Sequence, residues 1–233
     1  LVDIHGKPMI QRVYEQASKA LDTVYVATDD ERIEQAVRAF GGNVVMTSKD
    51  HSTGTNRCIE ALEKVNAQSD VAFDAVVNIQ GDEPMMEPSQ LKELLACFEY
   101  PHTDFATLVT PVKRLDDLYN ESEVFVVLDK NQNALYFSRS AIPHVTRLDR
   151  SKWLDRTTIY KHLGLYAYTE KALKRFAELE PGHLEQLESL EQLRWLENGG
   201  KIKVGITAHD SIPVDTVDDL ERVRDMLKDL EGP

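Results

Sequence analysis

The sequence is poor in features that mark several specialised classes of protein. Only 2 cysteines occur in 233 residues, and Cys58 and Cys97 form no CxxC pair, which argues against a disulfide scaffold or a zinc site. Both lie in apolar, helix-like contexts, so we expect core thiols in a reducing cytosol. No apolar run approaches the ~18 residues that a membrane helix needs, and no signal peptide is recognisable. We therefore expect a soluble cytoplasmic protein with no membrane partner.

Positive charge is also scarce. The chain has 27 basic and 40 acidic residues, a formal net charge of −13, and no polybasic run. A nucleic-acid partner is not expected, because such proteins carry a basic footprint. A phosphate-bearing ligand would need local cations or a metal ion to offset this acidic balance.

The chain contains an alternation of strand-like and helix-like segments. With 42% hydrophobic residues it can bury a substantial core. The βαβα order predicts an α/β fold with a largely parallel sheet and helices on both faces. Strands are predicted at residues 23–27, 43–47, 74–80, 105–112, 164–168 and 201–206, and helices after Pro8 and Asp30, at 55–65 and 91–98, from Glu170, over 184–198 and to near Leu230. The polar loop at residues 130–132 between two β-type segments predicts an antiparallel hairpin.

The stretch VVNIQGDEP places Asp82 directly after a strand-like run. Ligands of open parallel sheets bind at the carboxyl ends of strands, and a carboxylate there suits Mg²⁺, which takes oxygen ligands. The alternative is that Asp82 or Glu83 stabilises a turn before a helix.

A second carboxylate, Asp215 in SIPVDTVDDLERV, follows another apolar stretch. Its alternative is stronger, because Asp215 or Thr216 would be a good N-cap with Asp218 and Asp219 at the positive end of the helix dipole. If both aspartates end strands of one sheet, they could converge on one cation, which suits phosphoryl or nucleotidyl transfer.

The segment DHSTGTNR at residues 50–57 precedes a helix. It can present backbone N–H groups and hydroxyls to a polar ligand, with Arg57 one turn along. It lacks the Gly-Lys-Ser/Thr ending of a Walker motif. A helix merely capped by Thr53 or Thr55 is the alternative.

Two further side chains could reach an anionic ligand. Arg139 ends a hairpin strand, and His162 directly precedes the strand LGLYAY. A rim salt bridge or a satisfied histidine is the alternative for each. Residues Glu191 and Gln192 flank the leucine stripe 184, 187, 190 and 193, which is predicted to be buried.

Segments along the whole chain together resemble the cytidylyltransferases of 3-deoxy-manno-octulosonate (Kdo), the enzymes of Gram-negative lipopolysaccharide synthesis. These segments are DIHGKPMIQRV, VYVATDDERI, GTNR, VVNIQGDEP, ALYFSR, IP, YKHLGLYAY, LESLEQLRWLENG, IKV and VDTVDDLERV, in the order of the family. The resemblance implies a nucleotide-diphospho-sugar transferase fold, Rossmann-like with a mixed, mainly parallel sheet. It also implies one domain over residues 1–233, with a hairpin subdomain near residues 112–165 used for homodimerisation.

The resemblance also implies the reaction and its residues. The expected substrates are CTP and Kdo, the products CMP-Kdo and pyrophosphate, and the cofactor Mg²⁺. Asp82 and Asp215 resemble the magnesium ligands and the catalytic pair of the family. The positions that resemble nucleotide contacts are Gln80, Arg57 and Thr55, and those associated with the sugar acid are Arg139, His162, Glu191 and Gln192.

The chain departs from the family pattern at several places. The family's first strand and triphosphate loop, of the type IPARYASTRLPGKPL, would precede Leu1, and we expect them in the complete protein. Thr53, Asn56, Ser122 and Phe125 replace residues usual in the family, Phe125 standing where lysine is usual. The alternatives are a cytidylyltransferase for another acidic sugar, such as N-acetylneuraminate, and an inactive nucleotide-binding homologue.

Overall fold

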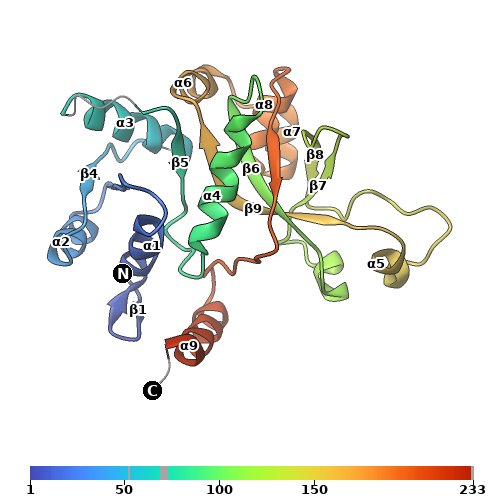
Figure 1. Ribbon diagram of the computed structural model, residues 1–233, viewed down its shortest axis with the longest axis horizontal. Helices are drawn as coiled ribbons and strands as arrows, with labels where there is room; N and C mark the ends of the chain where they lie inside the picture. The colour runs from blue at the N-terminus through green and yellow to red at the C-terminus, as the bar shows by residue number, and fades with distance from the viewer. Residues whose placement is uncertain (52, 69–72, 232–233) are drawn as a thin grey trace. The chain divides into compact units, whose positions relative to one another are not determined.

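Contacts along the chain separate two units in the computed structural model, which describes residues 1–51, 53–68 and 73–231 (Figure 1). Unit 1 comprises Leu1–Asp74, Asn78–Lys92 and Ser211–Pro233, and unit 2 comprises Ala75–Val77 and Glu93–Asp210. The chain therefore passes between the units within β5 (Val76–Asn78), within α4 (Pro88–Ala96) and after Asp210.

Unit 1 is built around a parallel pair of short strands. Thr28 of β3 (Val26–Thr28) lies opposite Met46 of β4 (Val44–Met46). The other elements are β1 (Asp3–Ile4), β2 (Lys7–Pro8), α1 (Met9–Ser18), α2 (Glu31–Ala39), α3 (Gly54–Asn66) and α9 (Val217–Glu231). Val223 and Leu227 of α9 pack with Ile4 in a buried cluster, so the last helix completes the core of this unit.

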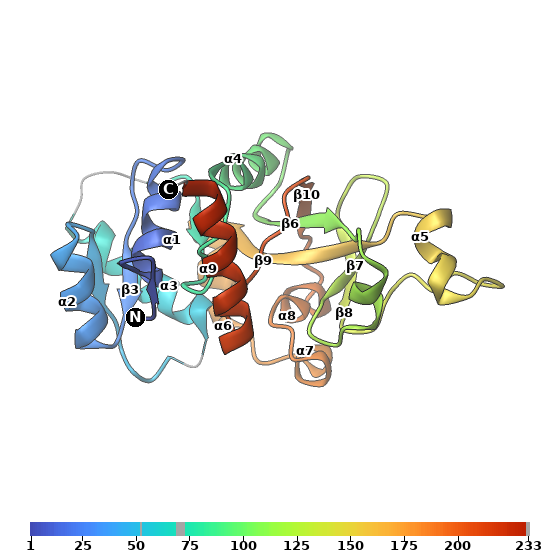
Figure 2. The ribbon, with the colours of Figure 1, turned by 90° about the horizontal axis from the view of Figure 1, so that it is seen from below.

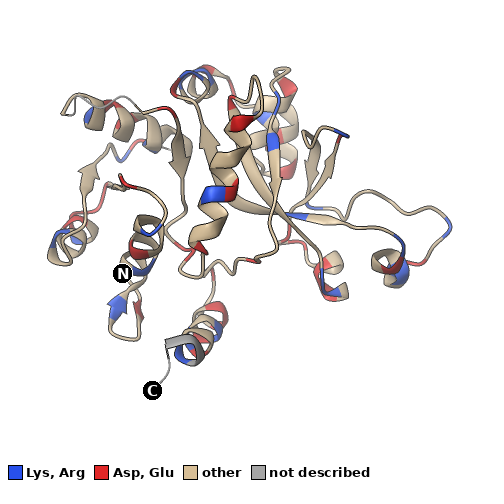
Figure 3. Cartoon of the chain, in the orientation of Figure 1, with Lys and Arg blue, Asp and Glu red and all other residues tan. Residues whose placement is uncertain are grey.

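Local signals explain where helices of unit 1 begin and end. The Asp30 carboxylate accepts a hydrogen bond from the N–H of Arg32, which confirms the predicted N-terminus of α2. Gly41 follows the helix with φ of +80°, a conformation that glycine adopts without steric penalty. In the described part of α9, basic and acidic residues are interspersed along the helix (Figure 3).

Unit 2 contains a sheet with strands in the order β10-β6-β9-β7-β8, and β5 also pairs with β9. Figure 2 shows the long strand β9 running between β6 and β7. The strands are β6 (Phe105–Pro111), β7 (Phe125–Leu128), β8 (Ala134–Ser138), β9 (Tyr160–Tyr168) and β10 (Lys203–Ile206). The helices are α5 (Trp153–Arg156), α6 (Glu170–Glu178), α7 (His183–Glu188) and α8 (Gln192–Glu197), with short 3₁₀ turns at Cys97–Glu99, Leu115–Tyr119 and Arg150–Lys152.

The sheet of unit 2 is mixed, as predicted, but parallel pairing does not dominate in it. β10 pairs with β6 in parallel, whereas β6 with β9, β7 with β9 and β7 with β8 are antiparallel. The expectation of a mainly parallel sheet is wrong for this unit, because the β-hairpin and the return strand β9 reverse the chain without a helical crossover.

The antiparallel hairpin itself is confirmed. β7 and β8 flank the predicted polar loop, in which Gln132 adopts φ of +59°. The carboxylate of Asp129 accepts hydrogen bonds from the N–H groups of Asn131 (2.7 Å) and Asn133 (2.8 Å), which holds the turn. A dimerisation role for residues 112–165 stays a prediction, as does the assignment of residues 1–233 to one domain.

The helix predicted over residues 184–198 is interrupted. It forms α7 and α8, separated at Ser189, which takes the left-handed conformation with φ of 53°. The leucine stripe is correspondingly wrong in part, since Leu187 is 69% exposed whereas Leu190 and Leu193 are buried. A stripe predicted for one continuous helix does not survive a break in that helix.

Large side chains of unit 2 pack in two buried groups. Phe105 of β6 packs on Tyr168, with ring centroids 4.3 Å apart, and Phe176 stacks on Trp195 at 6.1 Å. Around the hairpin, Phe125 is buried with Val112, Leu118, Trp153 and Ile159. An apolar residue at position 125 is therefore required by the packing of this chain.

Of the two predicted core thiols only one is fully buried. Cys97 is buried and Cys58 is half-buried. Burial raises the pKa of the Cys97 thiol to about 11, so it stays protonated and unreactive at neutral pH. Within the described residues, none of the helices combines the length and apolar character that crossing a membrane requires.

Candidate active site

The start of α3 brings together part of the predicted nucleotide site in unit 1. The Thr53 hydroxyl caps the helix by accepting a hydrogen bond from the N–H of Asn56 at 3.2 Å, which confirms the capping alternative for this residue. Thr55 is buried in the first turn. Ser52, in the same predicted segment, lies outside the described residues.

Arg57 is held in place by its own chain. Its guanidinium donates to the Thr47 hydroxyl at 2.6 Å and to the Ser48 carbonyl at 3.4 Å, and it pairs with Asp29 at 3.3 Å. These partners follow β3 and β4, so the guanidinium is fixed at the carboxyl ends of both strands. Such anchoring lowers the entropic cost of holding a long side chain against a ligand.

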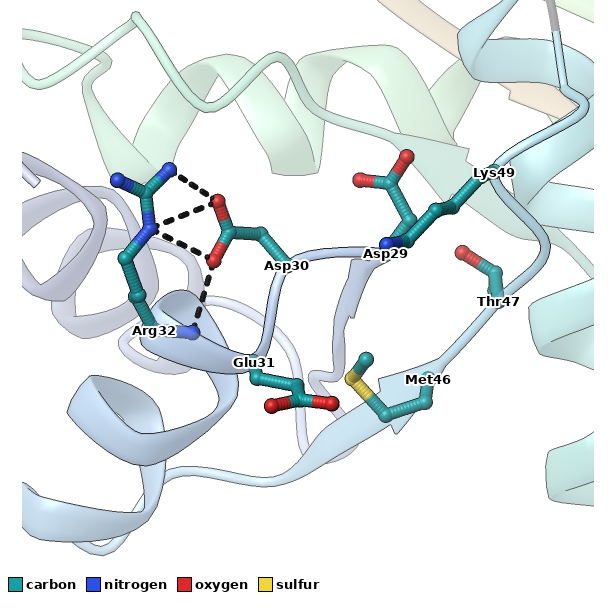
Figure 4. A pocket seen from close by; sticks show the side chains of 7 residues that line it. All are labelled: Asp29, Asp30, Glu31, Arg32, Met46, Thr47 and Lys49. Carbon is teal, nitrogen blue, oxygen red and sulfur yellow. Dashed lines mark hydrogen bonds and ion pairs between the residues drawn. The ribbon is translucent and has the colours of Figure 1, made fainter.

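A hollow of about 550 Å³ opens beside the partners of Arg57 (Figure 4). Its lining residues are Asp29, Asp30, Glu31, Arg32, Met46, Thr47 and Lys49. Asp30 and Arg32 pair with each other at its edge. Acidic and basic side chains thus both line this space.

Gln80 lies next to the N-terminus of α3. A Cβ atom on Gly54 would come within 3.6 Å of the amide nitrogens of both Asn78 and Gln80. Glycine at this position therefore permits a close approach between the helix and the end of β5. The three predicted nucleotide contacts, Thr55, Arg57 and Gln80, are consequently grouped around the first turns of α3.

The charge of one predicted metal ligand, Asp215, acts on the other, Asp82, within unit 1. Burial, and then the negative charge of Asp215, raise the pKa of Asp82. The N–H of Val214 donates to the Asp82 carbonyl at 2.9 Å, which ties the segment before Asp215 to the loop after β5. Within the described parts of the chain neither carboxylate forms an ion pair, so their repulsion has no cation to offset it.

This arrangement fits a hard divalent cation. Two carboxylates are oxygen donors, and Mg²⁺ is typically bound through one or two carboxylates plus water and substrate phosphate oxygens. Among the described residues, no group of three or more His, Cys, Asp or Glu side chains is arranged to hold a metal ion by itself. The remaining ligands would therefore come from water and substrate.

The helix cap of α9 is formed by Thr216 and not by Asp215. The N–H and the hydroxyl of Thr216 donate to the Asp219 carboxylate at 2.9 and 2.7 Å, and the Thr216 hydroxyl accepts from the Asp219 N–H at 3.2 Å. This reciprocal pair lowers the pKa of Asp219. The capping alternative for Asp215 is thus removed, which leaves its carboxylate available for another purpose.

Replacing Thr216 by alanine is expected to lower the free energy of unfolding by about 1 kcal/mol, because the cap is lost. Replacing Asp215 by asparagine is expected to leave it unchanged while turnover is lost. Urea unfolding of both variants beside an activity assay makes the comparison. A destabilised, active Asp215→Asn variant would instead assign the cap to Asp215.

In unit 2, three of the four predicted sugar-acid residues meet around Tyr166. The ring of His162 lies 5.3 Å from that of Tyr166, and the Tyr166 hydroxyl donates to Oε1 of Gln192 at 3.1 Å. Burial, and then the charge of Glu191, raise the pKa of Tyr166, so it stays neutral. Gln192 is buried, so it is not one of the surface residues that usually flank such a stripe.

His162 carries no charge in the folded protein at neutral pH. Burial lowers its pKa to about 3, so the imidazole is neutral at physiological pH. It cannot attract an anion by charge, because the desolvated ring does not hold a second proton. Its interaction with a ligand must therefore use hydrogen bonding.

Arg139 is placed by contacts with the break between α7 and α8. Its Nε donates to the Glu188 carbonyl at 2.8 Å and its Nη2 to the Ser189 carbonyl at 3.3 Å. The Glu188 carboxylate in turn accepts from the Arg139 N–H at 2.9 Å. Arg139 therefore satisfies carbonyl groups at the end of α7, while its side chain remains exposed.

The sequence reasoning did not select Tyr166, Thr107 or Glu188. Period-two alternation along β9 places residues 162, 164 and 166 on one face of the strand, and this signal could have identified Tyr166. Thr107 and Glu188 lie far along the chain from their partners, and no local pattern points to them.

Known proteins are similar to this chain in sequence and in fold. A family model described as "Cytidylyltransferase" matches residues 1–202. The chain is 55% identical to the 3-deoxy-manno-octulosonate cytidylyltransferase of Bacteroides thetaiotaomicron over 98% of the chain and 91% of that relative. It is 46% identical to the 8-amino-3,8-dideoxy-manno-octulosonate cytidylyltransferase of Shewanella baltica strain OS195 over 97% and 91% of the two chains.

Solved structures agree with these relatives. The structure of CMP:2-keto-3-deoxy-manno-octonic acid synthetase complexed with CTP is 40% identical, with a TM-score of 0.88 over 99% of this chain and 91% of that one. This match confirms the predicted fold class. A 4-diphosphocytidyl-2C-methyl-D-erythritol synthase from Anaerococcus prevotii, at 12% identity and a TM-score of 0.61, shares the fold alone. The chain belongs to the 3-deoxy-manno-octulosonate cytidylyltransferase family.

Proposed function

We propose that this protein transfers the cytidylyl group of CTP to Kdo and releases pyrophosphate. The observation that carries the proposal is the identity of 53 to 55% with three cytidylyltransferases of that substrate, over 95 to 100% of this chain. In the reaction the anomeric hydroxyl oxygen of Kdo bonds to the α-phosphorus, the hydroxyl proton is lost, and the bond to the bridging oxygen of pyrophosphate breaks. No covalent intermediate with the protein is required.

The proposed residues divide between the two units. In unit 1, Gln80, Thr55 and Arg57 would bind the nucleotide, and the contacts of Arg57 with Asp29 and Thr47 orient its guanidinium beforehand. In unit 2, Arg139 would bind the carboxylate of the sugar acid, with His162, Glu191 and Gln192 around its hydroxyl groups.

Asp82 and Asp215 would hold a magnesium ion. The negative charge of Asp215 near the buried Asp82 carboxylate supports this assignment, because a divalent cation would favour the ionised form of Asp82. Such an ion neutralises phosphate oxygens and polarises a bound hydroxyl group. The two side chains themselves supply the fixed negative charge that keeps the ion in place.

The proposal includes a homodimer in the cytoplasm, as in the family that the sequence resembles. The hairpin of β7 and β8 is the proposed element of the dimer contact. Light scattering that gives the mass of one chain in solution would contradict the dimer.

The decisive assay is pyrophosphate release by the purified protein with CTP and Mg²⁺. Kdo, 8-amino-3,8-dideoxy-manno-octulosonate and N-acetylneuraminate are compared as acceptors. Release is expected with Kdo at a kcat/KM about 100-fold above that with N-acetylneuraminate, since mismatched polar groups in a buried site discriminate strongly. Binding of CTP without release with any acceptor would favour an inactive nucleotide-binding homologue.

A further inference from the structure

The side chain of Thr107 contacts the imidazole ring of His162. Thr107 is fully buried on β6, and its hydroxyl oxygen lies 2.7 Å from the Leu165 carbonyl and 2.9 Å from Nε2 of His162. A carbonyl only accepts, and a threonine hydroxyl has one hydrogen. The hydroxyl therefore donates to Leu165, and the contact with His162 requires Nε2 to donate.

An irregularity of the sheet creates this contact. The register between β6 and β9 shifts between Thr107 and Leu108, so that Leu108 lies opposite Leu163 whereas Thr107 lies opposite Tyr166. Bulges redirect side chains and leave backbone groups outside the regular ladder. Thr107 satisfies one such carbonyl and at the same time reaches the imidazole.

The other ring nitrogen of His162, Nδ1, is left as a hydrogen-bond acceptor. Within residues 1–51, 53–68 and 73–231 this atom makes no hydrogen bond, and the residue, although largely desolvated, retains some exposed surface. The ring is held from its sides by the edge of Phe137, at 5.2 Å between centroids, and by Tyr166. An acceptor on a fixed ring suits a hydroxyl group and disfavours a carboxylate.

A second polar atom in the same cluster lacks a partner. Nε2 of Gln192 is buried and makes no hydrogen bond among the described residues, while the Tyr166 hydroxyl occupies the other end of the amide. A buried donor without a partner is rare unless a ligand or water completes it. The cluster thus offers one acceptor and one donor, the pairing that a polyhydroxylated ligand satisfies.

We propose that His162 is a neutral imidazole protonated on Nε2, that its Nδ1 accepts a hydrogen bond from a hydroxyl group of the sugar acid, and that Thr107 is the positioning residue that fixes this state. The proposal rests on the proposed function for the identity of the sugar acid. It separates two tasks within unit 2. Arg139, which is always charged, serves the carboxylate, and His162 recognises a hydroxyl group.

The protonation state can be measured without turnover. Long-range ¹H–¹⁵N correlation spectra of the ¹⁵N-histidine-labelled protein separate protonated from unprotonated ring nitrogens, and the His162→Gln variant assigns the signals among the 7 histidines. We expect a protonated Nε2 and an unprotonated Nδ1, both unchanged between about pH 6 and 8. The titratable groups around the ring are Tyr166 and, through it, Glu191. A cationic ring or a proton on Nδ1 would overturn the proposal.

Addition of Kdo to the labelled protein tests the hydroxyl contact. The Nδ1 resonance is expected to move while Nε2 keeps its position. Kdo that binds, as shown by other shifted resonances, without moving Nδ1 would overturn the contact. Absence of Kdo binding would count against the proposed function instead, and the tautomer of the free protein would still decide the role of Thr107.

The Thr107→Val and Thr107→Ser variants supply the matched pair. Valine keeps the shape but removes the hydroxyl, so we expect a mixture of tautomers and a KM for Kdo raised about 3- to 10-fold with the KM for CTP unchanged. Serine keeps the hydroxyl and is expected to restore both the spectrum and the KM. Wild-type spectra and KM values in Thr107→Val would contradict the positioning role, as would failure of serine to rescue.

Discussion

Replacing Asp82 by asparagine is expected to lower the kcat of pyrophosphate release at least about 100-fold, because metal binding contributes several kcal/mol of charge stabilisation. The free energy of unfolding is expected to stay unchanged or rise. The pKa of Asp82 is raised in the folded protein by burial and by Asp215. Stability therefore falls as the pH rises through that pKa, and the neutral amide removes this effect.

The matched control is Asp218→Asn. Asp218 is exposed in the first turn of α9, so the substitution makes the same chemical change near Asp215 without touching the proposed metal site. Activity within about twofold of the wild type is expected, with at most about 0.5 kcal/mol lost from the helix dipole. Near-normal activity of Asp82→Asn, or an equal loss in both variants, would remove Asp82 from the metal site. Titration of Mg²⁺ by calorimetry gives an independent measure, since binding should weaken only in Asp82→Asn.

Replacing Lys161 by methionine is expected to destabilise the protein by about 3 kcal/mol. Lys161 lies on β9, and its ammonium group is within 3.0 Å of Asp210, 3.2 Å of Glu123 and 3.7 Å of Asp117. Its side chain is only 8% exposed. Methionine fills a similar volume but removes the buried ammonium group from the three neighbouring carboxylates, so unfolding in urea should begin at a lower concentration.

The pH dependence of this stabilisation follows from the pKa of Lys161. Burial lowers that pKa, but the carboxylates of Glu123, Asp210 and Asp117 outweigh the effect and raise it above the ordinary 10.5. The contribution is therefore fully present below pH 10.5 and is lost as the pH rises through the raised pKa. Between about pH 6 and 9, titration of Lys161 should therefore not change the difference in the free energy of unfolding between wild type and Lys161→Met.

Lys174→Met is the matched control for this prediction. Lys174 pairs with Glu170 at 2.6 Å on the surface of α6, and its side chain is 50% exposed. Such i,i+4 pairs contribute about 0.3–0.5 kcal/mol. Equal losses in the two lysine variants would show that the burial and the three partners of Lys161 have no special weight.

Local sequence signals predicted the secondary structure of unit 1 better than that of unit 2. The N-terminus of α2 at Asp30 was predicted, and Thr53 was one of two residues considered for the cap of α3, because a capping hydrogen bond spans only two or three residues. The sequence left two residues open for the cap of α9, and the contacts of Thr216 with Asp219 resolved this choice. The prediction of one helix over residues 184–198 was wrong because its interruption involves a distant part of the chain. The carbonyls at its break are taken by Arg139, which lies about fifty residues away in sequence.

The difference between local patterns and distant contacts also applies to the candidate site residues. The motifs were sufficient to select Asp82, Asp215 and His162, since each follows or begins a strand-like segment with a recognisable pattern. The motifs did not show that the charge of Asp215 acts on Asp82, or that Arg57 is already paired with Asp29. Both contacts depend on which segments the fold brings together. The chemical state of these side chains thus required the folded chain.

The sequence by itself determined the α/β class, the N-terminus of α2 and the membership of a cytidylyltransferase family, because these depend on residue patterns along the chain. Only the tertiary structure decided the charge of His162, the surroundings of Lys161 and the interruption at Ser189. Each of these depends on burial or on partners from distant strands, such as Thr107, 55 residues from His162. Protonation follows the local dielectric and the nearby hydrogen-bond partners, and both are set by packing and strand register.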